Sequence, residues 1–418
     1  MKNGKILIQI ASYRDPELLP TLKDCIEKSK YPENLVFSIA WQHSPDDIWD
    51  NLSEYKDDKR FKIIDIDYKD SQGVCWARHK LQQNYNDEEY TLQLDSHHRF
   101  IQNWDDELIT MYKQLQIAGY KKPLLTGYIP SYDPNNDPGG RIIIPWRMNF
   151  DRFAPEGVVH TIPASIDNYK ELTSPERARF YSAHFAFTTG DFVKEVPHDP
   201  NYYFHGEEIS VGVRAYTWGY DLFHPHKVVI WHQYTRKEQK KHWDDYTTWY
   251  KLNETSFLRN RKLFRMDGEK RDVKFGPYDF GKIRSLDDYE KYSGLSFKKR
   301  SVQQYTLDKK LPPNPVLSDK EYKKSFVKFF KHCIDVGYDK VPEKDYEFWA
   351  VAFHRDGEGD TTLYRKDADV NEIKTLMNDP DKYCKIWREF ETTYQPKYWV
   401  VWPYSKSKGW CERITGNL

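Results

Sequence analysis

The chain has 418 residues, and its 64 basic and 64 acidic side chains give a formal net charge of +0 at pH 7. This balance excludes a global attraction to nucleic acid or to an anionic membrane, so an anionic ligand has to be bound by local groups. No apolar run is long enough to cross a bilayer, and the five scattered cysteines indicate neither a disulfide framework nor a zinc knuckle. We therefore expect a cytoplasmic protein with a main domain and a smaller companion.

The N-terminal part of the chain alternates apolar strand patterns with helical patterns. This rhythm predicts an α/β fold with a mostly parallel sheet and a nucleotide-binding half. Neither a G-x-G-x-x-G loop nor a Walker loop is present, so the nucleotide must be held in another way. The predicted strands cover residues 6–11, 35–41, 61–66 and 90–94, and the predicted helices cover residues 18–28, 48–55, 73–85 and 104–117.

The middle of the chain continues this alternation. A loop rich in Pro, Asn and Gly at residues 133–140 is expected to lie over the site. Glu207 and Glu208 begin a helix that ends at Gly219. The predicted elements here are strands at residues 124–128, 183–188, 221–224 and 228–231, and helical segments at residues 209–218, 235–265 and 284–299.

A Pro-rich break at residues 311–315 marks the predicted domain boundary. We expect a catalytic domain over residues 1–308 and a β-rich accessory domain over residues 309–418. Trp399, Trp402 and Trp410 could form a surface that stacks on a glycan or a peptide, but we expect most of them to lie in the core. The predicted strands of this second part cover residues 348–353, 361–364 and 398–402.

A short motif after the strand at residues 90–94 is a candidate cation site. In open α/β sheets, ligands bind beyond the carboxyl ends of the strands, where Asp95, Ser96 and His97 follow. The first and third side chains of an extended tripeptide point to the same side, so Asp95 and His97 can share one cation. An imidazole ligand favours Mn²⁺ over Mg²⁺. The alternative interpretation is a turn with a solvated Asp and His.

Two further groups of residues are candidates for nucleotide contacts. The segment Ala11-Ser12-Tyr13-Arg14 ends the first strand, where we expect it to face the base of a nucleotide. The alternative is a plain strand-to-helix turn in which Asp15 and Pro16 begin the next helix. Arg78 lies in the first turns of the helix at residues 73–85, where it would contact a phosphate or order the cation-binding carboxylate. A structural ion pair is the alternative for Arg78.

Glu207 and Glu208 lie at the start of a helix, where acidic residues are common because they oppose the helix dipole. That explanation accounts for one of them, whereas both together after His205 and Gly206 suggest an acid that faces a sugar. Glu208 would hydrogen-bond hydroxyls of a donor sugar, and either carboxylate could assist an acceptor hydroxyl. A reaction that inverts configuration would need one of them as a general base. The sequence does not decide between the two.

Five ordered motifs between residues 5 and 300 resemble the family of GlcNAc-transferases that modify hydroxyproline in the protein Skp1. More distantly, the sequence is similar to the polypeptide N-acetylgalactosaminyltransferases, in which a D-x-H motif and a later histidine bind Mn²⁺. On that pattern the later histidine is His232, which directly follows an apolar strand, as His97 does. His224, His226 and His242 do not match as well. The five motifs cover residues 10–17, 73–78, 92–97, 204–209 and 217–221.

The resemblance implies a GT-A fold, a UDP-sugar donor and retention of the anomeric configuration, with UDP-GlcNAc the expected donor. It implies that Mn²⁺ or another divalent cation is bound by Asp95, His97 and His232. The catalytic candidates are Glu207 and Glu208. The candidates for donor and nucleotide binding are Ala11, Ser12, Tyr13, Arg14, Arg78, Gln93, Asp95 and Ser96.

The leading hypothesis is transfer of GlcNAc to a hydroxyl of a protein, and a glycan or a surface polysaccharide is the alternative acceptor. A non-catalytic carbohydrate-binding protein would explain the 16% aromatic content, but it would not need a βαβα half with a cation motif at a strand end. A metal-dependent hydrolase would explain the Asp and His ligands, but it usually shows a denser set of them. The sequence leaves the acceptor and the oligomeric state open.

Overall fold

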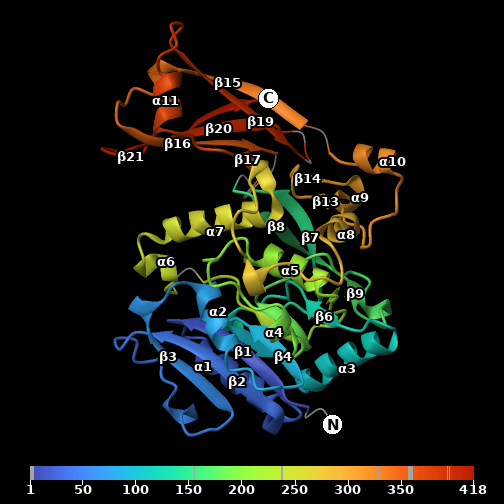
Figure 1. The fold of residues 1–418 in the computed structure, drawn as a ribbon. Coiled ribbons are helices and arrows are strands. Elements are labelled where there is room, and N and C mark those ends of the chain that lie inside the picture. The colour runs from blue at the N-terminus through green and yellow to red at the C-terminus, as the bar shows by residue number, and fades with distance from the viewer. Residues whose placement is uncertain are drawn as a thin grey trace.

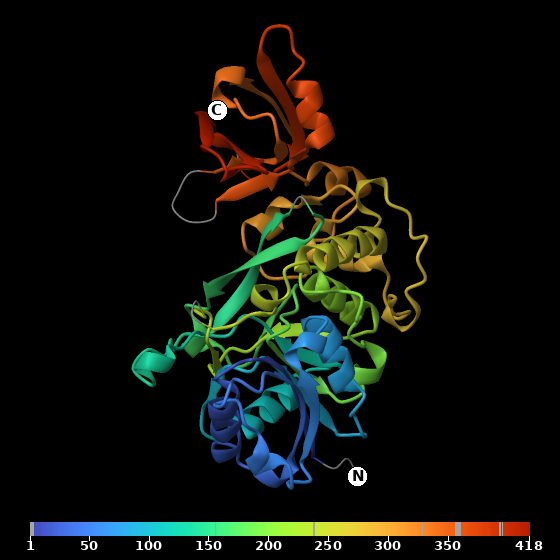
Figure 2. The same cartoon turned by 90° about the vertical axis from the view of Figure 1, so that its left-hand side faces the viewer.

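The computed structural model describes residues 4–154, 156–236, 239–327, 329–355, 361–392, 394 and 396–418. A large sheet covered by helices forms one end of the molecule, and a β-rich C-terminal part forms the other end (Figures 1 and 2). The predicted α/β class with a β-rich C-terminal part is therefore confirmed. Every helix in the described part of the chain is too short or too polar to cross a membrane.

The main sheet has eight strands among the described residues, in the order β3-β2-β1-β4-β10-β6-β11-β9. Strands β3, β2, β1 and β4 are parallel, whereas β10 runs antiparallel to both of its neighbours, so the sheet is mixed. Strands β1 and β2 are buried along nearly their whole length, which explains why they are almost continuously apolar. The strands are β1 (Ile6–Tyr13), β2 (Leu35–His43), β3 (Phe61–Asp67), β4 (Tyr90–Leu94), β6 (Pro123–Thr126), β9 (Glu176–Arg177), β10 (Phe185–Thr189) and β11 (Asp221–His224).

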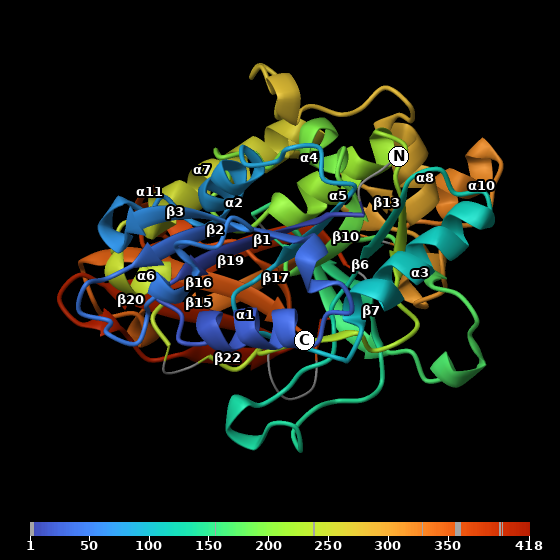
Figure 3. The ribbon, with the colours of Figure 1, turned by 90° about the horizontal axis from the view of Figure 1, so that it is seen from below.

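Helices cover both faces of this sheet (Figure 3). On one face, α1 (Leu18–Glu27) and α3 (Trp104–Ile117) contribute to a core with side chains such as Ile8 and Phe37. On the other face, α2 (Val74–Gln82) packs against β1 and β2, and α4 (Phe192–Glu195) and α5 (Glu207–Thr217) bury a second set of apolar side chains. The predicted helix at residues 104–117 is confirmed at both ends.

Parallel pairing places the carboxyl ends of β1 and β4 at the same edge of the sheet. The chain leaves β4 at Leu94 and forms the short strand β5 (His98–Phe100) four residues later. Strand β5 pairs with β12 (Ile230–His232), and His98 lies opposite His232 in the register. This small ladder brings the segment after β4 together with a strand end more than 130 residues further along the chain.

A second group of elements lies between the main sheet and the C-terminal part (Figure 2). The long hairpin of β7 (Trp146–Phe153) and β8 (Val159–Ser165) shares a core with the helices that follow α5. Its end reaches the C-terminal part, because Phe153 and Arg152 line a small cavity together with Leu363 and Thr392. The other elements of this group are α6 (His242–Asp245), α7 (Trp249–Phe264), α8 (Leu286–Ser293), β13 (Leu295–Ser296), β14 (Ser301–Val302), α9 (Gln304–Leu307) and α10 (Asp319–Lys324).

The C-terminal part has its own apolar core, formed by residues between Ile334 and Ile414. Strand β15 pairs with β19. Among the described residues, a second sheet has six strands, with β16 and β20 at its centre. The strands predicted at residues 348–353, 361–364 and 398–402 are confirmed as β16, β17 and β20. The elements are β15 (Phe329–Gly337), β16 (Tyr346–His354), β17 (Thr362–Arg365), β18 (Ala368–Asp369), α11 (Val370–Leu376), β19 (Tyr383–Glu391), β20 (Tyr398–Ser405), β21 (Gly409–Trp410) and β22 (Ile414–Asn417).

Three helical predictions are wrong in part. Residues 48–55 form turns that end in a single 3-10 turn, because polar side chains such as Asn51 bond to nearby backbone N–H groups instead of leaving them to a helix. Among the described residues of the segment 235–265, helix is confined to α6 and α7. The segment at residues 284–299 is helical only in α8, which ends at Gly294 with a positive φ of 72°. The 3-10 turns are η1 (Pro32–Asn34), η2 (Ser53–Tyr55), η3 (Tyr68–Asp70), η4 (Pro134–Asn136), η5 (Tyr169–Glu171), η6 (Met266–Gly268), η7 (Gly276–Tyr278) and η8 (Tyr338–Lys340).

The expectation that most of the three C-terminal tryptophans lie in the core is also wrong. Trp399 packs against the core, but Trp402 and Trp410 are 37% and 46% exposed. The two exposed rings lie against each other, with their centroids 4.4 Å apart, and Trp402 donates a hydrogen bond to the carbonyl of Cys411. They therefore lie on the outer face of the sheet.

Candidate active site

A cleft of about 1010 Å³ opens beyond the carboxyl ends of β1 and β4. Its walls come from these strand ends, the start of α2, the loop at residues 131–140, β8, the start of α5 and the segment that follows β12. Most of the residues proposed from the sequence meet here, although they are spread over more than 200 positions. Those that line the cleft are Ala11, Tyr13, Arg78, Asp95, Ser96, His97, Glu207, Glu208 and His232.

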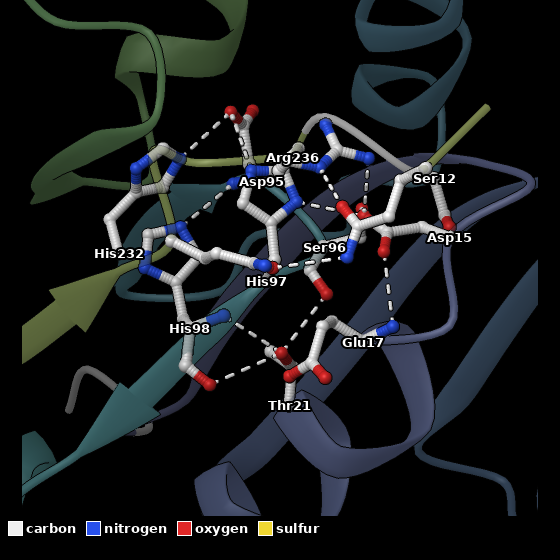
Figure 4. A network of polar contacts seen from close by, with 12 residues as sticks. Ser12, Asp15, Glu17, Thr21, Asp95, Ser96, His97, His98, His232 and Arg236 are labelled. Atoms are coloured by element: carbon white, nitrogen blue, oxygen red, sulfur yellow. Dashed lines mark hydrogen bonds and ion pairs between the residues drawn. The ribbon is translucent and has the colours of Figure 1, made fainter. Parts of the chain in front are cut away.

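Asp95, His97 and His232 converge in this cleft (Figure 4). One ligand atom from each of the three residues lies within 4.8 Å of the other two. Oδ2 of Asp95 is 3.7 Å from Nε2 of His97 and 3.4 Å from Nε2 of His232. The three donors thus form a compact set of one carboxylate and two imidazoles, as expected from the sequence.

The charge of Asp95 is fixed by its neighbours. Arg78 donates to Oδ1 of Asp95 over 2.7 Å, which leaves Oδ2 facing the two histidines. Burial alone would raise the pKa of Asp95, but His232, Arg78 and His97 outweigh that effect and hold the pKa well below its ordinary value. Asp95 is therefore a carboxylate at neutral pH.

His232 is buried, and neither of its ring nitrogens has a hydrogen-bond partner among the described residues. Burial lowers the pKa of His232 to about 4, against the opposing effect of Asp95, so the ring is neutral at pH 7. A neutral imidazole with a free nitrogen beside a carboxylate is suited to bind a cation. The donor set therefore fits a divalent metal ion, and its nitrogen content favours a transition metal such as Mn²⁺.

His98, the neighbour of His97, has a structural role. Its Nδ1 donates to the carbonyl of Trp231 over 3.0 Å, and its Nε2 accepts from the backbone N–H of Asp95 over 3.2 Å. Both ring nitrogens are therefore occupied, and the ring fixes the loop that carries Asp95 and His97.

Arg78 also links Asp95 to Glu207. Its Nη1 donates to Oε2 of Glu207 over 2.7 Å, and Oε1 of Glu207 lies 2.6 Å from Nδ1 of His198. Burial would raise the pKa of Glu207, but Arg78 and His198 outweigh it and lower the pKa. Glu207 is thus a buried carboxylate whose two oxygens are both engaged, and it holds Arg78 in place.

Glu208 has different surroundings. Its Oε1 accepts from the backbone N–H of Ala183 over 2.9 Å and from the hydroxyl of Ser182 over 3.3 Å, with no cation in direct contact among the described residues. Burial raises the pKa of Glu208 to about 7, although the bond from Ala183 opposes the rise. Of the two glutamates, Glu208 is the one that has a carboxyl group available to a ligand.

Three residues proposed for donor binding do not line the cleft. Ser12 is fully buried, and Gln93 is buried with its amide group bonded to the carbonyl of Ala183 and to His198. Arg14 has a positive φ of 45° and turns away to bond with Asp47, in the loop after β2, and with Asp245, at the end of α6. These side chains support the walls of the cleft and do not form its surface.

Several residues of the cleft or its support were not identified from the sequence. The ring of His184 is stacked on His232, with centroids 4.3 Å apart, and its Nε2 lies 3.2 Å from the hydroxyl oxygen of Tyr234. Asp15 bonds to His97 behind the cluster, and Arg236 bonds to Asp15. Asp15 could have been identified by its place in the motif at residues 10–17, but the sequence predicts only the start of a helix there. No local pattern distinguishes His184 or Arg236 from other basic residues.

The comparisons with known proteins come from sequence and from structure. The profile of a family described as Glycosyltransferase (GlcNAc) matches residues 5–60 and 50–299. A comparison with curated proteins gives no match. Among solved structures, the chain is similar to GalNAc-T7 with UDP, GalNAc and Mn²⁺, at 13% identity and a TM-score of 0.41, over 68% of this chain and 54% of that chain. It thus spans about half of the GalNAc-T7 chain that it matches.

Two further similar structures are of other glycosyltransferases. Residues 1–349 of S. aureus TarS with UDP-GlcNAc match at 12% identity and a TM-score of 0.37, over 64% of this chain and 68% of that chain. The mannosyltransferase PcManGT from Pyrobaculum calidifontis with GDP-Man and Mn²⁺ matches at 11% identity and a TM-score of 0.36, over 66% of each chain. The family profile, by contrast, covers more than half of the sequence and includes Asp95, His97 and His232. The chain therefore belongs to the GlcNAc glycosyltransferase family.

Proposed function

We propose that this glycosyltransferase transfers GlcNAc from UDP-GlcNAc to a hydroxyl group of a protein, with retention of the anomeric configuration. The observation that carries the proposal is the convergence of Asp95, His97 and His232 in a cleft at the carboxyl ends of β1 and β4. In open α/β sheets this edge is where nucleotide ligands bind.

The three donors would hold Mn²⁺ or another divalent cation. When bound, such a cation supplies positive charge that stabilises the diphosphate of a departing UDP group. The chain has cationic side chains in the same cleft, which is lined by Arg236, Lys240 and Lys241. Because the formal net charge of the chain is zero, an anionic diphosphate has to be bound by local positive charges, and these side chains supply them.

Arg78 and Glu207 act as supports in this proposal. Arg78 holds one oxygen of Asp95 at 2.7 Å, so that the other oxygen stays directed at the histidines. Glu207 in turn holds Arg78. Glu208 is assigned to the sugar or to the acceptor hydroxyl, because it lines the cleft and is free of any direct ion pair within the described residues.

Other side chains of the cleft are suited to an acceptor. Strand β8 contributes His160 and Thr161, and the rim carries Phe204 and Trp243, which are partly exposed and lie 5.8 Å apart between ring centroids. These side chains are neutral or weakly basic and aromatic, so they favour an acceptor with nonpolar surface around its hydroxyl.

The proposal is tested with a set of UDP-sugars in the presence and absence of Mn²⁺. We expect UDP release from UDP-GlcNAc alone among the common donors, dependent on Mn²⁺ and abolished by EDTA. Replacing His232 with Ala should reduce UDP release at least ~100-fold in a protein that remains folded by circular dichroism. The control is His226→Gln, because His226 is also a buried histidine but belongs neither to the donor set nor to the lining of the cleft.

Three results would contradict parts of the proposal. Full activity of His232→Ala would remove His232 from the site, and activity without any divalent cation would remove the metal. Preference for a different UDP-sugar would change the assigned donor but not the reaction class. Product analysis by NMR of the anomeric proton decides between retention and inversion.

A further inference from the structure

Asp15 lies directly behind the proposed cation site. It follows β1, precedes α1 and is 1% exposed. Its Oδ2 accepts from the hydroxyl of Ser96 over 2.6 Å and lies 2.8 Å from Nδ1 of His97 and 3.0 Å from the guanidinium of Arg236 (Figure 4). Its Oδ1 accepts from the backbone N–H of Glu17 over 3.0 Å. Four donors thus surround a single buried carboxylate.

The contact between Asp15 and His97 fixes the imidazole. A carboxylate can only accept a hydrogen bond, so Nδ1 of His97 must carry the proton. In the neutral ring Nε2 is then the unprotonated nitrogen, and it lies 3.7 Å from Oδ2 of Asp95. A carboxylate that accepts from the far nitrogen of a histidine is the common support of a metal-binding imidazole.

The other donors connect this carboxylate to the rest of the site. Ser96 lies between Asp95 and His97, so its bond to Asp15 holds the loop that carries both residues. Arg236 comes from the segment after β12, four positions beyond His232, and its Nε also bonds to Gln239. The side chain of Asp15 therefore connects the end of β1, the loop after β4 and the segment after β12. These three parts of the chain carry or flank the proposed metal ligands Asp95, His97 and His232.

We propose that Asp15 is a positioning residue, which holds His97 in the tautomer and orientation that bind the divalent cation. This inference rests on the proposed function, since it concerns the same cation. Asp15 touches neither the donor sugar nor the acceptor; it acts through the ring of His97.

A general loss of stability must be separated from this role, because any buried carboxylate supports the fold. Asp105, in α3, offers a matched control. It is also 1% exposed, and it accepts from the hydroxyl of Ser29 and from the backbone N–H groups of Lys30 and Tyr31 over 2.7 to 2.9 Å. None of these residues lines the cleft.

The experiment titrates Mn²⁺ alone into the protein of 418 residues and follows free Mn²⁺ by electron paramagnetic resonance. We expect Asp15→Asn to weaken Mn²⁺ binding by about 10- to 100-fold, and Asp105→Asn to leave it within about twofold of wild type. Melting temperatures of both variants are measured in parallel without metal. Unchanged binding in Asp15→Asn, or an equal loss in Asp105→Asn, would overturn the inference.

A second measurement is made on the wild-type protein, so it does not require the Asp15→Asn variant to fold. In wild-type protein with ¹⁵N-labelled histidine, the two nitrogen shifts of His97 report which nitrogen carries the proton, with His97→Gln used for assignment. The inference predicts the Nδ1–H form without metal, and an Nε2–H form would overturn it. A wild-type protein that binds no Mn²⁺ would overturn the proposed cation site together with this inference, whereas binding that is insensitive to Asp15→Asn overturns this inference alone.

Discussion

Glu207 and Glu208 are adjacent in the sequence, but their surroundings predict different effects of substitution. Glu207 is buried between Arg78 and His198, so Glu207→Gln should leave a buried cation poorly paired. We expect it to lower the free energy of unfolding by about 2–4 kcal/mol. Glu208→Gln keeps an acceptor for the N–H of Ala183 and should cost less than ~1 kcal/mol near pH 6, while reducing sugar transfer at least ~100-fold.

Chemical denaturation and UDP release, measured on the same preparations, distinguish the two residues. If both variants lose stability and activity in the same proportion, Glu208 has a structural role like that of Glu207. If Glu208→Gln is stable and fully active, the carboxyl group of Glu208 has no part in the reaction.

The pKa of Glu208 makes a separate prediction about pH. Burial raises this pKa from its ordinary value of 4.5 to about 7, so the folded protein binds the proton more tightly than the unfolded chain does. The unfolded chain begins to release its proton near pH 4.5, and the folded state does so only near pH 7. Stability from this group is therefore present at low pH and is lost as the pH rises through this window.

Urea denaturation at pH 5 and pH 8 tests this sign. Wild-type protein should lose about 1–3 kcal/mol more stability between these values than Glu208→Gln, which cannot titrate. Other groups that titrate in the same range contribute equally to the stability of both proteins, so their contributions cancel in the comparison. Parallel pH profiles for wild type and variant would show that the carboxyl group of Glu208 is not destabilised by burial.

At the level of elements, the start of α2 positions Arg78 and depends on one glycine. Gly73 precedes α2 with a φ of +100°, and a Cβ added there would lie 2.5 Å from Cδ2 of Tyr203, which also lines the cleft. Gly73→Ala therefore combines backbone strain with a clash, and we expect it to cost about 2–4 kcal/mol and to reduce UDP-sugar turnover through a displaced Arg78.

Gly119→Ala is the matched control, because Gly119 has a nearly identical φ of +99° but no described atom within 4 Å of an added Cβ. It should cost only about 1–2 kcal/mol and leave turnover unchanged. Thermal melts and UDP release on the three proteins check the prediction. Equal effects of the two substitutions would mean that backbone conformation alone matters at Gly73 and that the contact with Tyr203 adds nothing.

For the whole molecule, the contacts of residues 309–327 bear on the proposed division into two domains. The guanidinium of Arg179 is buried and donates to the carbonyls of Ser293 and Lys310 and to the side chain of Asn314. Val327 bonds to the backbone of Val302. These contacts belong to the first part of the chain, although they lie beyond the boundary predicted at residue 308. We therefore propose that the catalytic domain ends near residue 327.

Two truncated proteins test this boundary. Residues 1–327 should fold and bind UDP with Mn²⁺, whereas residues 1–308 should be less stable by about 3 kcal/mol or more, since Arg179 loses two of its three acceptors. Thermal melts and calorimetry with UDP measure both properties. Equal stability of the two proteins would support the boundary at residue 308, and loss of UDP binding by soluble 1–327 would show that the C-terminal part completes the donor site.

The sequence by itself determined those features that depend on neighbours along the chain. The apolar run of β4 followed by Asp95 and His97, and the 3.6-residue pattern of α3, arise from periodicity within one element, so their positions were predictable. His232 was found because its strand and the motif pattern agree. Periodicity failed at residues 48–55 and within residues 235–265, where local side-chain bonds and chain reversals replace a continuous helix.

Only the tertiary structure decided which side chains meet. Asp15 and His97 are 82 residues apart, and Arg78 and Glu207 are 129 residues apart, so no local pattern shows that each pair forms a hydrogen bond. The structure also separated Glu207, which is paired with Arg78 and His198, from Glu208, which has no cation in contact among the described residues. The physical reason is that local preferences fix φ, ψ and the exposed face of an element, whereas pairing of strands and packing of helices determine where that face lies in space.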